Sequence, residues 1–227
     1  MVTENTQTLN DKAWIRWSAL FIVAFTMMAA YYVNDVMAPL KSMLEGQLSW
    51  TSGEFGMFTG AYSFLNVFLL MLIWGGLILD KFGIRFTGIL ATVLMVGGTA
   101  VEYIAITQYG GTSEMLWGYK LDVLMASAGY SVFGVGAEVA GITVTKIIAK
   151  WFKGKEIALA MGVQVALARI GSQAAYAIAI PVAKAYSLET PLFIGAAVLV
   201  GGFFAFLAFS LMDRKLDKQV RISTTCN

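Results

Sequence analysis

Long apolar stretches separated by short polar segments dominate the chain. Because a helix rises about 1.5 Å per residue and the hydrocarbon layer of a bilayer is roughly 30 Å thick, about 20 mainly apolar residues make one crossing. A barrel would require alternating strands, whereas these runs are continuous, so we expect an all-α integral membrane fold. The pattern predicts six transmembrane helices, at residues 14–37, 53–79, 86–107, 121–149, 156–183 and 191–212.

Composition supports this interpretation and excludes several other classes of protein. The chain is 58% hydrophobic and 13% charged, with a mean hydropathy of +0.71, which is far too apolar for a water-soluble domain. A net charge of +2 without a dense basic stripe gives no reason to expect a nucleic-acid partner. Glu4 and Asp11 make the N-terminus unlike a cleaved signal peptide.

Candidate chemistry for catalysis or metal binding is missing from the sequence. There is no His, and the only Cys is Cys226, so neither a disulfide framework nor a Cys/His metal site is expected. No nucleophile–base pair or phosphate-binding loop is present either. We therefore expect no cofactor, no metal and no enzymatic activity.

The distribution of basic residues predicts the orientation of the helices. With a cytoplasmic N-terminus, twelve of the sixteen Lys and Arg residues fall on the cytoplasmic side, while only Lys41, Lys120 and Lys184 fall outside and Arg169 lies within a helix. Positive residues favour the cytoplasmic side of a membrane, so both termini should face the cytoplasm.

The link between the second and third segments carries the most specific motif. Residues 76–85 read GLILDKFGIR, which resembles the signature loop of the major facilitator superfamily, Gly-x-x-x-Asp-Arg/Lys-x-Gly-x-Arg/Lys. Gly76 would permit close helix approach and Gly83 a tight reversal, and Asp80 could pair with a base or cap a helix, while Lys81 and Arg85 would hold the loop at the cytoplasmic face. The resemblance implies a latch between two halves of a transporter.

A second motif lies between the fourth and fifth segments. Residues 151–169 read WFKGKEIALAMGVQVALAR, and with GVGAE at 134–138 they are similar to the lysosomal dipeptide transporters of the superfamily and their bacterial relatives. From local chemistry alone, we expect Trp151 and Phe152 to anchor the membrane interface and Glu156 to oppose the positive end of the following helix.

Two ionisable residues lie deep within apolar segments at nearly the same level. Glu138 is about 18 Å and Arg169 about 21 Å from the cytoplasmic ends of their helices, by counting residues. A charge at that depth costs about 2.5–3.5 kcal/mol on insertion scales, so both should face a partner or a watery cavity. Glu138 could accept an ammonium group and Arg169 could hold a carboxylate, as the resemblance also implies for a dipeptide; the alternative is a permanent structural salt bridge.

Other polar residues could join this pair. Asn66 falls at the same level and could face the cavity or make an interhelical hydrogen bond. Of the neighbours Tyr31 and Tyr32, we take Tyr32 as the candidate substrate-binding residue, although the sequence does not decide which points inward. Asn34, Asp35 and Glu102 fall nearer the outer ends, where we expect solvated side chains.

Taken with the resemblance, these features imply the N-terminal six-helix half of a transporter, built from two inverted three-helix repeats. We expect a cytoplasmic tail at 1–13, the helical unit at 14–212 and the start of a cytoplasmic linker at 213–227. The expected function is alternating-access transport of a small organic solute, with di- and tripeptides favoured; organic anions or sugars, and a non-transporting scaffold, are the alternatives. The expected partners are the bilayer, a small-molecule substrate and either a C-terminal six-helix half or a parallel homodimer. A bacterial inner membrane is the simplest location, and an organelle membrane is the alternative.

Overall fold

The computed structural model describes residues 8–225, so the expectations for residues 1–7 and for Cys226 lie outside the described part. Almost all of the described chain is helical, and one short hairpin of strands is the exception. The elements are η1 (Leu9–Asp11), α1 (Ala13–Val36), η2 (Ala38–Leu40), α2 (Lys41–Gln47), α3 (Ser52–Phe68), α4 (Met71–Gln108), β1 (Met115–Leu116), β2 (Tyr119–Lys120), α5 (Leu121–Trp151), α6 (Ile157–Ala185) and α7 (Thr190–Thr225).

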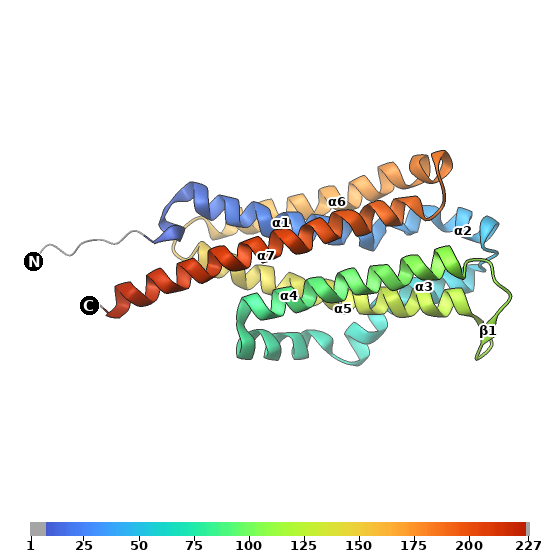
Figure 1. Cartoon of the computed structure of the whole chain (residues 1–227), viewed down its shortest axis with the longest axis horizontal. Coiled ribbons are helices and arrows are strands. Elements are labelled where there is room, and N and C mark those ends of the chain that lie inside the picture. The colour runs from blue at the N-terminus through green and yellow to red at the C-terminus, as the bar shows by residue number, and fades with distance from the viewer. Residues whose placement is uncertain (1–7, 226–227) are drawn as a thin grey trace, which may run out of the picture.

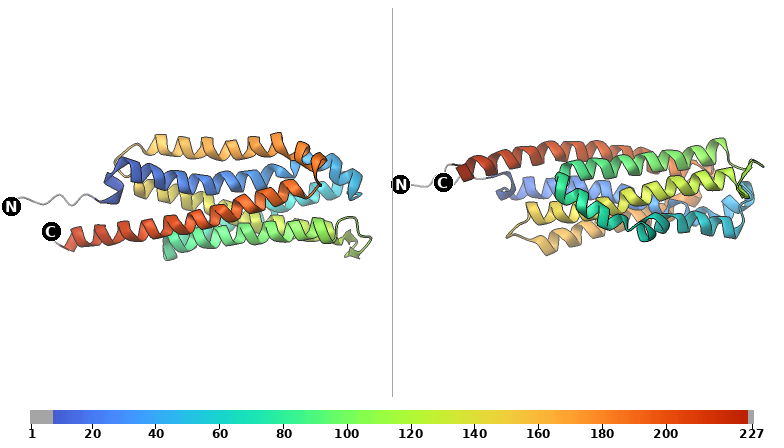
Figure 2. Two further views of the ribbon diagram at one scale, coloured as in Figure 1. Left: turned by 45° about the horizontal axis from the view of Figure 1, so that its top comes forward. Right: turned by 90° about the horizontal axis from the view of Figure 1, so that it is seen from below.

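The long helices run up and down in one elongated bundle (Figure 1). Helix α1 packs against α6 and α7, while α5 packs against α3 and α4, and the contact between α4 and α7 joins the two groups. Figure 2 shows the same arrangement from two further sides. We call the end with the Gly83 reversal, where α1 starts and α7 ends, the Gly83 end, and the end with the hairpin the Trp117 end.

Five helices among the described residues are long and apolar enough to cross a membrane. The second segment expected from the sequence, 53–79, is instead divided between α3 and the first part of α4. Leu69 and Leu70 interrupt it, and Leu70 adopts a left-handed conformation with φ of 51°. No Pro or Gly stands at this point, so the apolar pattern could not reveal the break.

Helix α4 contains a sharp reversal at Gly83, where φ is 78°. Residues 71–82 run toward the Gly83 end, and residues 84–108 return from it (Figure 1). Only glycine adopts this backbone region without strain, so the hairpin predicted from the signature loop is confirmed.

The returning part of α4 lies very close to α5. A Cβ added at Gly98 would stand 2.4 Å from the backbone nitrogen of Phe133, and one added at Gly129 would stand 2.7 Å from the backbone nitrogen of Glu102. Small residues let helix backbones approach in this way, which is the packing role expected for such residues in a membrane bundle.

Candidate functional site

A cavity of about 250 Å³ lies among α1, α3 and α5. Its wall is mixed, with small or aliphatic residues from α1 and α5 and polar side chains from each of the three helices. Such a mixture of apolar lining and a few convergent polar groups is typical of small-molecule sites. The lining residues are Met27, Ala30, Tyr31, Asn34, Thr59, Tyr62, Tyr130, Ala137, Glu138 and Gly141.

Glu138 is the charged residue of this wall, as its depth in the sequence predicted. The Tyr62 hydroxyl donates a hydrogen bond of 2.8 Å to Oε1 of Glu138. The second carboxylate oxygen takes part in no protein hydrogen bond in residues 8–225, while the side chain is half-buried. The carboxylate is therefore held in place from one side and can accept another donor.

Arg169 lies next to the cavity and not in its lining. Its guanidinium carbon is 5.4 Å from the centre of the Tyr31 ring, and Tyr31 does line the cavity. Among the ion pairs of the described residues, none joins Arg169 to Glu138. A permanent salt bridge between these two residues is thus not what this structure contains.

The other two predicted binding residues point elsewhere in this conformation. The Asn66 amide donates to the backbone oxygen of Tyr62 in the same helix. The Tyr32 hydroxyl donates to the backbone oxygen of Pro191, and its ring borders a separate apolar pocket between α1, α6 and α7. Their roles in substrate binding remain predictions.

Sequence reasoning did not assign four polar members of the wall to the cavity: Asn34, Thr59, Tyr62 and Tyr130. Tyr130 donates hydrogen bonds to the backbone oxygen of Asn34 at 2.8 Å and to its Oδ1 at 3.3 Å, while the Asn34 amide donates to Asp35 at 2.8 Å. Thr59 and Tyr62 come from α3. Helical spacing could have indicated Asn34, because Tyr31 and Asn34 are three residues apart and so share a face of α1.

The signature loop forms a second polar site, at the Gly83 end. Lys146 of α5 pairs with Asp80 at 2.6 Å, and the Lys81 ammonium lies 5.4 Å from the centre of the Phe82 ring. A Cβ at Gly76 would meet nothing within 4 Å, whereas one at Gly75 would stand 2.7 Å from a Val139 side-chain carbon. Close helix approach was therefore predicted for the wrong glycine of the pair.

Arg85 belongs to an ionic cluster that links α4, α5 and α7. It lies 2.9 Å from Asp217 and 3.4 Å from Asp213, and Lys150 lies 2.7 Å from each of the same two carboxylates. Trp151 donates its indole N–H to Asp213 at 3.1 Å. The four charged residues, without Trp151, line a pocket of about 320 Å³ next to Gly83.

The tryptophan–phenylalanine pair is not an interfacial anchor, contrary to our expectation. Trp151 and Phe152 are both only 1% exposed. Trp151 packs on Phe209, and Trp17 meets Phe152 edge to ring with 5.4 Å between centres. Trp151 therefore lies inside the bundle against α7, and Phe152 lies inside it against α1.

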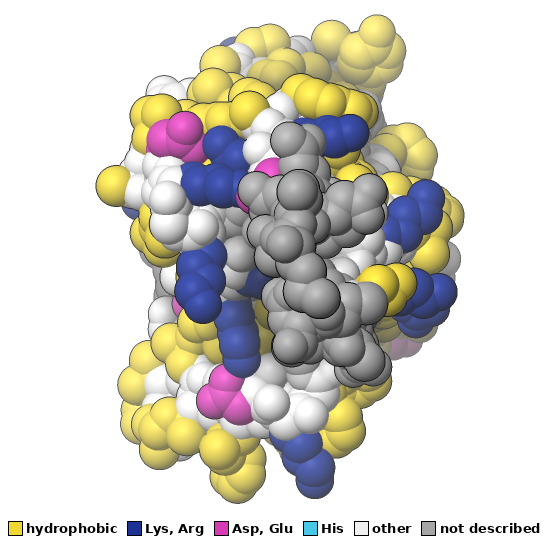
Figure 3. Space-filling view, turned by 90° about the vertical axis from the view of Figure 1, so that its left-hand side faces the viewer, with side chains coloured by type: hydrophobic (Ala, Val, Ile, Leu, Met, Phe, Trp, Pro, Cys, Tyr) yellow, Lys and Arg dark blue, Asp and Glu magenta, His cyan; other side chains and the backbone are white. Residues whose placement is uncertain are grey.

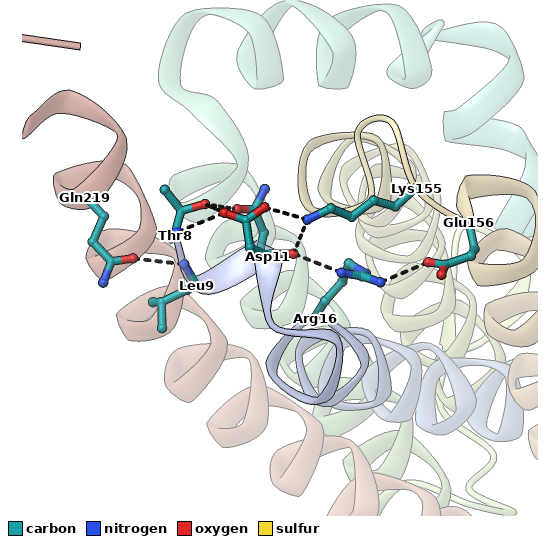
Figure 4. A network of polar contacts seen from close by, with 8 residues as sticks. Thr8, Leu9, Asp11, Arg16, Lys155, Glu156 and Gln219 are labelled. Carbon is teal, nitrogen blue, oxygen red and sulfur yellow. Dashed lines mark hydrogen bonds and ion pairs between the residues drawn. The ribbon is translucent and has the colours of Figure 1, made fainter. Parts of the chain in front are cut away.

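A third network ties the start of the chain to α6 and α7 (Figure 4). Arg16 pairs with Glu156 at 3.0 Å, Lys155 pairs with Asp11 at 2.9 Å, and the Leu9 amide donates to Gln219. The hydrogen bond from Lys155 is the main reason that the pKa of Asp11 falls to about 2. Glu156 has a lowered pKa through a hydrogen bond from its own backbone N–H and through Arg16.

Lys and Arg side chains are spread over the Gly83 end of the molecule (Figure 3). Within residues 8–225, no group of three or more acidic, His or Cys side chains is placed to hold a metal ion.

Comparison with known proteins places this arrangement in a family. A sequence model described as the Major Facilitator Superfamily matches residues 20–224. The chain belongs to the major facilitator superfamily. This superfamily member is a multi-pass integral membrane protein of a transporter family.

Curated relatives of this superfamily member include the lysosomal dipeptide transporters of several animals. The mouse (Mus musculus) protein is 26% identical over 214 residues, covering 89% of this chain and 43% of its own length. The cattle (Bos taurus) and human proteins are 30% and 29% identical over 158 residues, covering 69% of this chain and 31% of theirs. The chain thus spans less than half the length of the relatives that it matches.

Proposed function

We propose that this superfamily member carries a small zwitterionic solute, with short peptides as the favoured class, by alternating access. The observation that carries the proposal is the cavity whose wall contains Glu138, with one carboxylate oxygen unbonded, and Tyr31, whose ring Arg169 contacts from outside the lining. The dipeptide transporters among its relatives support the same class of solute.

The two charges differ in how they would engage such a solute. Glu138 would accept an ammonium group with the oxygen that Tyr62 leaves open. Arg169 would leave the Tyr31 ring and bind a carboxylate with two parallel hydrogen bonds, which are stronger than the contact given up: a cation–π contact at an exposed site contributes about 0.5–1 kcal/mol. Tyr31 would then hold Arg169 in the free state and release it in the bound state. Asn66 would enter the site only after α3 rotates, and Tyr32 only after α1 rotates.

We further propose that the chain forms six crossings arranged as two inverted three-helix repeats. In this arrangement α3 and residues 71–82 together make the second crossing, and both termini face the cytoplasm, most simply at a bacterial inner membrane. Single cysteines introduced in a Cys226→Ser background test the orientation. An impermeant maleimide should reach Trp117→Cys from outside the cell and Lys153→Cys only after the cells are opened, and the reverse pattern would exclude it.

A wall opposite the cavity would come from a second six-helix unit, either a C-terminal half or a parallel second copy. The share of the relatives that the chain covers supports the former. The signature loop and the ionic cluster of Arg85 would then be the gate at the cytoplasmic side. Light scattering of the purified chain in detergent distinguishes the two, because a dimeric mass supports the second copy.

Binding can be tested on the chain itself, without transport. We would titrate a dipeptide into the chain in lipid nanodiscs by calorimetry and compare Arg169→Ala and Glu138→Gln with wild type. Hydrogen bonds to charged groups contribute about 1.5–3 kcal/mol, so each variant should lose about 10-fold or more in affinity. Arg214→Ala and Glu114→Gln remove the same charges from exposed positions outside the cavity and should bind as wild type does.

Blocked peptides separate the rival solute classes. A zwitterion site should lose affinity both for N-acetylated and for C-amidated peptides, whereas an organic-anion site should tolerate the N-acetyl group. Unchanged binding in both Arg169→Ala and Glu138→Gln would reject the proposed site. A folded chain that binds no solute but assembles with a partner would favour the scaffold function.

A further inference from the structure

Glu102 in α4 is buried completely, which its place near the outer end of a helix did not predict. Its exposed fraction is 0%, and neither carboxylate oxygen has a hydrogen-bond partner. An ionised carboxylate without a partner is very unfavourable in an apolar interior, and the ordinary resolution is that the group keeps its proton. The expectation of a solvated side chain at this position was wrong.

The burial follows from a close backbone contact between α4 and α5. Gly98 and Glu102 lie one helical turn apart on α4, and the backbone of α5 at Gly129 approaches both of them. A solvated Glu102 would require α4 and α5 to separate, because the glycine contact leaves no room for water between the two backbones. The protonation state of Glu102 is thereby tied to the packing of these helices.

Among residues 8–225, the ionisable groups found near Glu102 are tyrosines and one carboxyl group. Helix α5 contributes Tyr130, which follows Gly129 at the contact with Glu102. Asp35 of α1 and Tyr176 of α6 interact electrostatically with Tyr130 in turn. Helix α7 has no ionisable side chain between Thr190 and Met212. From α3, Tyr62 reaches this neighbourhood through its ring contact with Tyr130, with 5.5 Å between ring centres.

We propose that Glu102 is a proton-binding site that holds its proton while α4 and α5 are packed as they are here and releases it to water only when they separate. Tyr130 connects this site to the cavity, since it lines the cavity and contacts Tyr62, which in turn donates to Glu138. Loss of the proton would place a negative charge beside Tyr130. If the proposed transport function holds, solute movement and this proton are therefore coupled.

Infrared spectroscopy tests the proton directly and needs no transport. A protonated carboxylic acid has a carbonyl-stretch band at higher frequency than a carboxylate, and the band shifts in heavy water. We expect this band in the chain in lipid nanodiscs, unchanged between about pH 5 and about pH 8, where an ordinary glutamate is ionised. The wild-type minus Glu102→Gln difference spectrum should contain it, and the wild-type minus Glu114→Gln spectrum should not.

Two results would overturn the proton site: a wild-type chain without the band, or a band of equal size in Glu102→Gln. Because Gln has nearly the same shape as the neutral acid, circular dichroism and thermal unfolding of that variant should match wild type. The pH titration of the wild-type band decides the question even if the variant fails to fold.

Coupling has its own readout. If uptake of a dipeptide into liposomes is observed, it should respond to a pH gradient in wild type and lose that response in Glu102→Gln. Wild-type uptake that is the same with and without the pH gradient would overturn the coupling. A band without any uptake, measured once the second six-helix unit or second copy is present, would instead contradict the proposed transport function and leave the proton site in place.

Discussion

Asp213 is the charged side chain that the bundle surrounds most completely on the Gly83 side. It is 0% exposed, yet Lys150, Trp151 and Arg85 all face its carboxylate. A buried charge of this kind is tolerated only when donors compensate for the water that it has lost. Asp217 shares two of these partners but is 33% exposed at its side chain, so water can replace them.

Substituting the two aspartates should therefore have unequal effects. We expect Asp213→Asn to lower the free energy of unfolding by about 2 kcal/mol, because hydrogen bonds to charged groups contribute about 1.5–3 kcal/mol. Asp217→Asn should lower it by less than about 1 kcal/mol, as for exposed ion pairs. Equilibrium unfolding in mixed micelles measures both, and equal losses would contradict the distinction.

Helices α4 and α5 approach each other closely because glycines, which have no side chain, lie at their contact. Gly98 faces the α5 backbone, whereas its neighbour Gly97 would meet nothing within 4 Å after gaining a Cβ. The same contact encloses Glu102, so the short distance between α4 and α5 is what keeps the Glu102 carboxyl group away from water.

Adjacent glycines give a matched test of this contact. Gly98→Ala should destabilise the chain by about 1–3 kcal/mol, since a methyl group against a backbone cannot be relieved by a rotamer change. Gly97→Ala should be neutral or stabilising by up to about 1 kcal/mol through helix propensity. Thermal unfolding would show the difference, and a similar loss at both positions would argue that helix flexibility, not contact, explains the glycines.

Across the whole molecule, ionic networks are concentrated at one end. The network of Asp11 and Arg16 joins η1 and α1 to the start of α6, and the cluster of Asp213 joins α7 to α4 and α5. Since the apolar spans cannot hold such pairs in lipid, this end is where charge can fasten helices together.

Acid should loosen the first of these networks before it affects the bundle. The pKa of Asp11 is lowered from 3.8 to about 2, so its stabilising contribution is complete above about pH 4 and is lost as the pH falls through about 2. We therefore expect Asp11→Asn to lower the unfolding temperature at pH 6 but not at about pH 2. A difference from wild type that persists at the lower pH would contradict the pairing with Lys155.

The sequence was sufficient for the helical membrane fold and for the reversal at Gly83, because hydropathy and a φ-permissive glycine are local properties. It also singled out Glu138, which lines the cavity. It could not decide between Tyr31 and Tyr32, since an apolar helix surface leaves its rotation undetermined. The break at Leu70 and the burial of Glu102 depend on neighbouring helices, which no local pattern records.

Helix α7 has 36 residues and is therefore about 54 Å long, well beyond the thickness of a hydrocarbon layer. Its last turns carry Asp217, which pairs with Arg85 of α4 and Lys150 of α5, and Gln219, which accepts a hydrogen bond from Leu9 of η1. A twist applied to that projecting segment would strain both attachments together. The end of α7 is thus a lever through which a force at the Gly83 end would reach both groups of helices.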